Sequence, residues 1–166
     1  MVKIVEEKEL EKFHQLFSQV LREGFPEYPS RLIEFFINND FSFENLKKQL
    51  EKKEITILMD EEVNGLLGFL LYEKPYGGVS YCAWVGVLKG VRGKGIGRKL
   101  MEEWEKQILA LGGHKLMLLT QSQINRNIFP RYGFKEEGCE EKSWFGLDAW
   151  IFGKIINEPK LENYMI

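Results

Sequence analysis

A segment rich in glycine and in cations is the part of this chain best suited to bind an anion. It reads Arg92-Gly93-Lys94-Gly95-Ile96-Gly97-Arg98 and lies between an apolar strand pattern and a helix pattern. The alternating glycines remove Cβ atoms at a sharp turn, so that backbone N–H groups can close around an anion. The positive end of the helix dipole and three basic side chains favour phosphate at the same place. The segment therefore predicts a site for a phosphorylated cofactor.

Two well-known phosphate-binding loops do not fit this segment. A nucleoside-triphosphate loop needs Lys followed by Ser or Thr after its last glycine, whereas Arg98-Lys99 follows Gly97 here. A dinucleotide loop needs G-x-G-x-x-G after the first strand of a repeated βαβ unit. Here the glycines follow a G-x-G-x-G pattern after the third strand of a predicted meander. A third pattern, R-x-x-G-x-G, is met by Arg92, Gly95 and Gly97.

This third pattern, taken with the strand Val85-Gly86-Val87 and the later Tyr132-Gly133-Phe134, resembles the GNAT superfamily of N-acyltransferases. The resemblance covers nearly the whole chain. It implies that the glycine loop holds the pyrophosphate of acetyl-CoA, the cosubstrate. The loop residues implied to bind it are Arg92, Gly93, Lys94, Gly95, Ile96, Gly97 and Arg98.

Gly86 lies inside an otherwise strong strand, which suggests a bulge or a close approach of another backbone. The resemblance implies a bulge that separates Val79–Val87 from Lys115–Thr120 and admits the thioester arm of acetyl-CoA. Backbone groups at Val85 and Val87 would then bond the arm, and an N–H there would polarise the acetyl carbonyl. The alternative is that Gly86 only relieves crowding beside Trp84.

Acetyl transfer needs a neutral amine nucleophile. A lysine-like amine has a pKa of about 10.4, so roughly one molecule in two thousand is neutral at pH 7. At the position where the superfamily often has a glutamate base, this chain has Tyr81, which could hold a water. Three carboxylates, Glu27, Asp40 and Glu73, are alternative bases.

The leaving thiolate needs a proton, and here the chain departs from the superfamily. The usual tyrosine acid falls on Phe129, which has no proton to give and is assigned to cofactor binding. Tyr132 is the predicted acid instead. A usual asparagine falls on Ser122, and Asn125 is the predicted substitute as a cofactor contact. Loss of the acid is tolerable, because a thiol of pKa about 8.5 leaves readily and acid catalysis contributes about 10²–10⁴-fold.

Aromatic residues of the front helices and hairpin loops predict an apolar acceptor cleft. They are Phe25, Tyr28, Phe35, Phe36, Phe41, Phe43, Tyr76, Trp144 and Phe145. The expected partner is a small-molecule or peptide amine. The sequence shows no acidic cluster, so a strongly cationic acceptor such as a polyamine is not favoured.

Apolar spacing and glycine positions predict the elements around the loop. Helices are expected at Glu6–Arg22, near Ser30, after a Ser42 cap, at Arg98–Leu111 and, as a short helix or turn, at Asn125–Arg131. Strands are expected at Val2–Val5, Ile55–Met59, Leu66–Tyr72, Val79–Val87, Lys115–Thr120, Lys135–Cys139 and Leu147–Ile156, with turns at Asp60–Gly65 and Lys74–Gly78. This order predicts an α/β fold with a mixed sheet. The resemblance implies a largely antiparallel central sheet, helices on both faces and a V-shaped splay between the fourth and fifth strands.

The 166 residues are expected to form a single domain, residues 1–166. The net charge of −2, with no aromatic residues among the loop cations, argues against a nucleic-acid partner. No apolar run approaches the ~20 residues of a membrane span. Without a signal pattern at the N-terminus, a cytoplasmic location is expected.

The cysteines and histidines point to no metal site. Cys82 and Cys139 are interpreted as small core hydrophobes, which suits a reducing compartment. His14 and His114 are the only histidines, too few for a zinc site. A homodimer agrees with the superfamily, although no sequence feature demonstrates it.

Two functions therefore remain open. The first is an acetyl-CoA-dependent N-acetyltransferase in which the amine attacks directly within a ternary complex. The second is a CoA-binding sensor or regulatory module with little turnover, suggested by Phe129 and Tyr81 at the positions of the usual acid and base.

Overall fold

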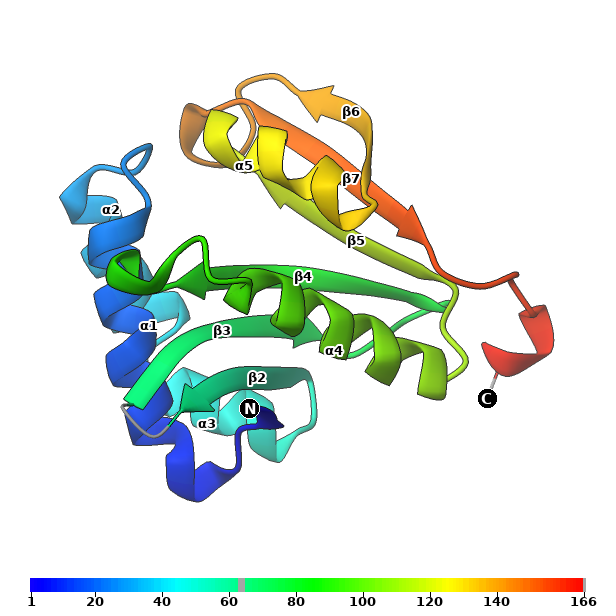
Figure 1. Cartoon of the computed structure of the whole chain (residues 1–166), viewed down its shortest axis with the longest axis horizontal. Helices are drawn as coiled ribbons and strands as arrows, with labels where there is room; N and C mark the ends of the chain where they lie inside the picture. The colour runs from blue at the N-terminus through cyan, green and yellow to red at the C-terminus, as the bar shows by residue number, and fades with distance from the viewer. Residues whose placement is uncertain (63–64, 166) are drawn as a thin grey trace.

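A seven-stranded sheet organises the chain in the computed structural model, which describes residues 1–62 and 65–165 (Figure 1). The strand order is β1-β2-β3-β4-β5-β7-β6, and each neighbouring pair is antiparallel except β4 and β5, which are parallel. The strands are β1 Val2–Ile4, β2 Ile55–Glu62, β3 Gly65–Glu73, β4 Val79–Val87, β5 Lys115–Thr120, β6 Lys135–Glu140 and β7 Ala149–Ile155. The expected mixed, largely antiparallel sheet is confirmed.

Helices cover both faces of this sheet. They are α1 Leu10–Gly24, α2 Ser30–Phe35, α3 Phe43–Glu51, α4 Ile96–Ala110 and α5 Gln123–Ile128. Shorter turns of helix are η1 Glu7–Glu9, η2 Phe36–Asp40, η3 Lys89–Val91, η4 Phe129–Tyr132, η5 Trp144–Gly146 and η6 Leu161–Asn163. Among the described residues, none of these helices has the length and apolar character that crossing a membrane requires.

Two hydrophobic cores lie on opposite faces of the sheet. Ile57 and Phe69 pack with α1, α2 and α3, whereas Leu58 and Leu70 pack with α4. This alternation follows from the two-residue period of side chains along a strand. Trp104 of α4 is fully buried, and its Nε1 donates to Ser80 Oγ of β4 at 2.9 Å. The helix that follows the glycine loop is therefore fixed to the central strand.

The sequence predicted most element bounds closely but erred in several details. The helix expected at Glu6–Arg22 is divided into η1 and α1, and the one expected at Asn125–Arg131 into α5 and η4. Cys82 is buried as expected, but Cys139 is exposed, because β6 is the outer strand of the sheet. The expected turn Asp60–Gly65 includes residues 63–64, which lie outside the described residues.

β4 and β5 pair only at their starts, over Val79–Cys82 and Lys115–Leu118. Beyond these residues β5 continues to pair with β7, and the two central strands diverge, as Figure 1 shows. The expected V-shaped splay is confirmed. The bulge beside it is at Ala83, because Trp84 pairs with Leu71 while Cys82 pairs with the adjacent Tyr72.

Gly86 is not the bulge that the sequence suggested. It pairs regularly with Phe69 of β3. A Cβ at Gly86 would collide with Val20 of α1. The glycine is therefore needed to leave room for the Val20 side chain of α1, so the crowding that it relieves comes from α1 and not, as the alternative expected, from Trp84.

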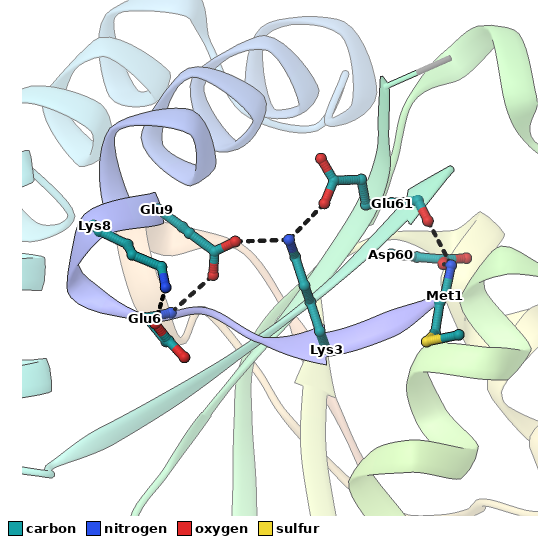
Figure 2. Close-up of polar contacts among 7 residues, drawn as sticks. All are labelled: Met1, Lys3, Glu6, Lys8, Glu9, Asp60 and Glu61. Carbon is teal, nitrogen blue, oxygen red and sulfur yellow. Dashed lines mark hydrogen bonds and ion pairs between the residues drawn. The ribbon is translucent and has the colours of Figure 1, made fainter. Parts of the chain in front are cut away.

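Ion pairs fasten the start of the chain to β2 (Figure 2). Lys3 Nζ lies 2.6 Å from Glu9 Oε1 and 2.5 Å from Glu61 Oε2. Hydrogen bonds to Glu61 and Glu9 raise the pKa of Lys3 above its ordinary value. The Met1 ammonium lies 2.8 Å from Oδ1 of the fully buried Asp60. These contacts hold η1, and through it the start of α1, against the sheet edge.

Candidate active site

The glycine loop presents a row of free backbone donors at the start of α4. Gly93 and Gly95 have φ values of +80° and +81°, a conformation that favours glycine. A Cβ at either position would meet nothing within 4 Å. The first amide of the turn with a backbone acceptor is Lys99 N–H, which donates to Gly95 O at 3.1 Å. Among the described residues, the N–H groups of residues 93–98 have no acceptor, so they are available to an anion.

Cationic side chains flank these donors. Arg92 Nε donates to Val87 O at 3.1 Å, which ties the loop to the end of β4. Its Nη2 lies next to Gly24, so close that a Cβ there would be 2.6 Å away. Arg98 Nη2 donates to Arg131 O at 3.3 Å, and Lys94 is exposed. Arg92 thus supports the loop, while Lys94 projects its charge freely.

Tyr132 belongs to the surroundings of this loop. The Arg98 guanidinium lies 5.3 Å from the centre of its ring. A Cβ built at Gly97 would be 3.3 Å from the Tyr132 hydroxyl oxygen. The hydroxyl therefore lies beside the first turn of α4. Tyr132 is not among the side chains that line the cavity described next.

A cavity of about 240 Å³ occupies the splay between β4 and β5. Tyr81, Val85, Asn125 and Phe129, all predicted site residues, line it together. Val87 and the glycine loop do not line the cavity. They follow the lining residues of β4 along the chain, and the loop carries the free amides. One strand therefore connects the free amides to the cavity.

Aromatic rings form the wall of the cavity on the side of the front helices. Trp84 makes edge-to-face contacts with Phe25, Phe36 and Phe41 at centroid distances of 5.3–5.7 Å. The predicted aromatic residues that do line the cavity are Phe25, Tyr28, Phe36, Phe41, Trp144 and Phe145. Trp84 was missed as a lining residue, because alternation along a strand does not reveal which face a cavity occupies.

Three of the predicted aromatic residues lie elsewhere. Phe43 packs against the core of α1 and α3, Phe35 points to solvent, and Tyr76 is 92% exposed at the β3–β4 turn. Tyr76 is far from the cleft because it lies at the opposite end of β4 from the splay.

Phe145 closes the cavity from the other side. It lies in the connection between β6 and β7, and its ring packs edge-to-face on Phe36 at 5.2 Å. Its φ of +59° is unusual for a residue other than glycine. Gln121 Nε2 donates to the neighbouring Trp144 O at 2.7 Å, which holds the connection in place.

The charged side chains that line the cavity are all carboxylates. Glu27 precedes α2, Asp40 ends the wide helical turn η2, and Glu73 ends β3. No lysine, arginine or histidine is among the described lining residues. The sequence analysis considered these carboxylates one at a time, because residues far apart in sequence are brought to one cavity only by the fold.

Burial keeps the phenols and the thiol of the cavity protonated. It raises the pKa of Tyr81 well above its ordinary value, with a smaller contribution from the charge of Glu73. Burial and the nearby Glu27 raise the pKa of Tyr28 to about 12, and burial also raises the pKa of the Cys82 thiol. Tyr81 is therefore a hydrogen-bond donor at neutral pH, and the carboxylates are the groups able to take a proton. Among the described residues, no cluster of side chains suits a metal ion.

Several solved structures share this fold. The PaiA N-acetyltransferase from Thermoplasma acidophilum, in complex with coenzyme A, is 19% identical with a TM-score of 0.78, covering 93% of this chain and 99% of that one. Ribosomal-protein-alanine N-acetyltransferase from Brucella melitensis is 21% identical with a TM-score of 0.72 and the same coverage of 93% and 99%. An aminoglycoside 6′-acetyltransferase type Ii is 17% identical with a TM-score of 0.71, covering 96% and 99%. No curated protein sequence matches this chain.

The family model described as the acetyltransferase (GNAT) family matches residues 10–134. This range includes α1, the splayed strands, the glycine loop and Phe134, and it amounts to most of the chain. This family match agrees with the free backbone N–H groups at the start of α4 and with the cavity between the parallel strands β4 and β5. The chain belongs to the acetyltransferase (GNAT) family, whose members are acyltransferases.

Proposed function

We propose that this protein is an N-acetyltransferase that moves the acetyl group of acetyl-CoA directly to an acceptor amine. The observation that carries the proposal is the row of free N–H groups at residues 93–98, joined by β4 to the cavity in the splay. The glycine loop fits a diphosphate because its amides are free and no Cβ obstructs them. Acetyl-CoA would supply an activated acetyl thioester.

The residues assigned to the cosubstrate fall into two groups. The amides of residues 93–98, with Lys94 and Arg98 beside them, bind the diphosphate. Val85, Asn125 and Phe129 line the cavity and contact the thioester arm. The backbone of Val85 and Val87, beyond the last residue of β4 that pairs with β5, offers the arm an open strand edge.

The acceptor nitrogen attacks the thioester carbonyl carbon, so a C–N bond forms as the C–S bond breaks. The nitrogen loses a proton and the departing sulfur gains one. Because Tyr81 stays protonated, we assign it to hold a water, and we assign the proton to a carboxylate of the cavity. Glu73 is our choice, since it lines the same cavity as Tyr81 and its charge contributes to the raised pKa of Tyr81.

The source of the proton for sulfur distinguishes the two candidate functions. Phe129 lines the cavity but has no acidic proton, and Tyr132 remains our predicted acid. Without any acid, turnover would fall by about 10²–10⁴-fold. The absence of an acidic proton at Phe129 favours the second candidate, a CoA-binding sensor with little turnover.

Two measurements test both candidate functions. The first is calorimetry with acetyl-CoA, and the second is an assay of thiol release with a panel of amines. Transferase activity requires binding together with release for at least one amine. Binding with no release for any amine would favour the sensor, and absence of binding would contradict both.

Gly95→Val tests the loop itself. The new side chain would face the anion site, and φ of +81° disfavours any residue other than glycine. We expect loss of acetyl-CoA binding with the fold retained. Gly90→Val is the matched control, because Gly90 has open space around it and no positive φ. Unchanged affinity in Gly95→Val would refute the assigned loop.

The acceptor, the location and the assembly stay predictions. Relatives of the same fold are named for an aminoglycoside and for a ribosomal protein, so both small and protein amines occur among them. For this chain we propose a small-molecule or peptide amine. A cytoplasmic location and a homodimer are further expectations, which cell fractionation and sedimentation would test.

A further inference from the structure

The end of β5 contributes two buried hydroxyl groups to the wall of the cavity in the splay. Thr120 and Ser122 both line this cavity and are only 6% and 7% exposed. Thr120 Oγ1 accepts from Ser122 N–H at 3.1 Å, and Ser122 Oγ accepts from Asn125 N–H at 3.3 Å. In the part of the chain that the structure describes, the Ser122 hydroxyl donates to no acceptor. Thr120 thus fixes the backbone of Ser122, and Ser122 keeps a proton that it can donate.

Ser122 lies across the splay from the stretch of β4 that we assign to the thioester arm. The two strands pair in parallel over Val79–Cys82 and Lys115–Leu118. Continuing this register beyond the last pair brings the residues that follow Thr120 level with Val85. Val85 and Ser122 line the same cavity. An arm held along Val85 would therefore have the Ser122 hydroxyl on its other side.

Few other donors on this side of the cavity are available to the departing sulfur. Phe129 lines the cavity but has no acidic proton, and Tyr132 does not line it. Gln121 Nε2 already donates to Trp144 O and Leu147 O, at 2.7 and 3.3 Å. Ser122 therefore offers a free hydroxyl proton where Phe129 and Gln121 offer none.

We propose that the Ser122 hydroxyl donates a hydrogen bond to the sulfur of acetyl-CoA and stabilises the thiolate as the C–S bond breaks. This inference rests on the proposed function, because it assigns a donor to the leaving group of that reaction. The hydroxyl keeps its proton, so Ser122 acts beside Tyr132, the predicted acid, and does not replace it. A fixed donor acts more strongly on a charged sulfur than on a neutral thioester. The bond therefore contributes to turnover more than to binding.

The test measures the pKa of the CoA thiol while CoA is bound to the protein. The thiolate absorbs ultraviolet light, and subtracting the spectra of the complex with desulfo-CoA removes the protein's own thiols and phenols. In Ser122→Ala we expect the pKa of the bound thiol to rise by about one pH unit, because a hydrogen bond to a charged group is lost. We expect kcat for acetyl transfer to fall on the order of tenfold, with little change in the dissociation constant of acetyl-CoA.

Ser42→Ala is the matched control for the loss of a helix cap. Ser42 caps α3 as Ser122 caps α5, because it accepts from Asn45 N–H at 3.4 Å, but it does not line the cavity. Ser42→Ala should leave the pKa of the bound thiol and kcat unchanged. Ser122→Thr keeps both the hydroxyl and the cap, so it should retain the low pKa of the bound thiol. Thermal unfolding checks that each variant is folded.

An unchanged pKa of the bound thiol in Ser122→Ala would overturn the proposal. So would an equal shift in Ser42→Ala, or a larger shift in Thr120→Val, which removes the other buried hydroxyl. The titration uses CoA without an acceptor and needs no turnover. Binding of CoA with no acetyl transfer to any amine would therefore refute the proposed transferase while the titration still decides on Ser122, and absence of CoA binding would refute both.

Discussion

The Tyr132 hydroxyl lies at the first turn of α4, close to Gly97 and under the Arg98 guanidinium. From this place it can serve the coenzyme in two ways, as a proton donor to sulfur or as a hydrogen-bond donor to phosphate. The two roles differ in what they change, because acid catalysis acts on turnover and a ground-state contact acts on binding.

For Tyr132→Phe we expect kcat to fall by about 10²-fold, with a smaller change in acetyl-CoA affinity. The kinetics are compared with calorimetry on the same variant. A loss of affinity that accounts for the whole effect would assign the hydroxyl to phosphate binding, and equal turnover would remove Tyr132 from the mechanism. Tyr76→Phe, at an exposed phenol far from the cavity, is the control.

Tyr28 gives the fold a dependence on alkaline pH. Its pKa is raised to about 12 by burial and by Glu27, whereas the unfolded chain has the ordinary value of about 10. The unfolded chain thus loses this proton first, so stability from the neutral phenol is present below pH 10 and is lost as pH rises through 12.

Tyr28→Phe should therefore lessen the fall in the free energy of unfolding between pH 10 and pH 12, on the order of 1 kcal/mol, while the stability at pH 8 changes little. Urea unfolding of both proteins at pH 8, 10 and 11 measures the difference. Parallel pH profiles for the two proteins would show that Tyr28 stays accessible to ionisation in the folded state.

At the scale of elements, α1 and β4 meet at a point where no Cβ fits. Gly86→Ala would press against Val20, and we expect a loss of about 1–3 kcal/mol in the free energy of unfolding. Val20→Ala removes the colliding group, so the double variant should be more stable than the sum of the two single changes predicts. Urea unfolding of the unmodified protein, the two single variants and the double variant completes this double-mutant cycle. Strict additivity of the changes in unfolding free energy would mean that the strand shifts to avoid the clash.

Local patterns explain why the elements were predictable and the cavity walls were not. The bounds of β4 and β5 follow from apolar runs that begin after glycine pairs. Ser42 was recognised as a helix cap, and in the structure it accepts from Asn45 N–H. The bulge at Ala83 depends on pairing with β3, and no residue type signals it. The wide turn of η2 likewise depends on packing around Phe36.

The set of carboxylates that line the cavity in the splay was unpredictable for a related reason. Glu27, Asp40 and Glu73 were considered one at a time as bases, because nothing in the sequence places them together. Their convergence depends on how α2, η2 and β3 pack, which is a property of long-range contacts. The prediction of the glycine loop, by contrast, depended on local sequence alone, and its free amides could be anticipated from seven consecutive residues.

At the scale of the molecule, a bound coenzyme would join the two halves of the sheet across the splay. Binding to the folded state alone raises stability by about 2.7 kcal/mol at a concentration one hundred times the dissociation constant. For a domain of this size we expect the midpoint of thermal unfolding to rise by about 5–10 °C with CoA. Scanning calorimetry measures it, and Gly95→Val should show no rise. A similar rise in that variant would place the coenzyme elsewhere.

Phe145 carries a backbone conformation that costs a side-chain-bearing residue about 1–2 kcal/mol. The same residue supplies the ring that rests on Phe36 across the mouth of the cavity. A glycine would relax the main chain but would abandon this bridge between the β6–β7 connection and the front helices. The β6–β7 connection and the front helices are therefore tied through this one ring contact, and removing the ring would relieve the main chain at Phe145 while separating the two segments.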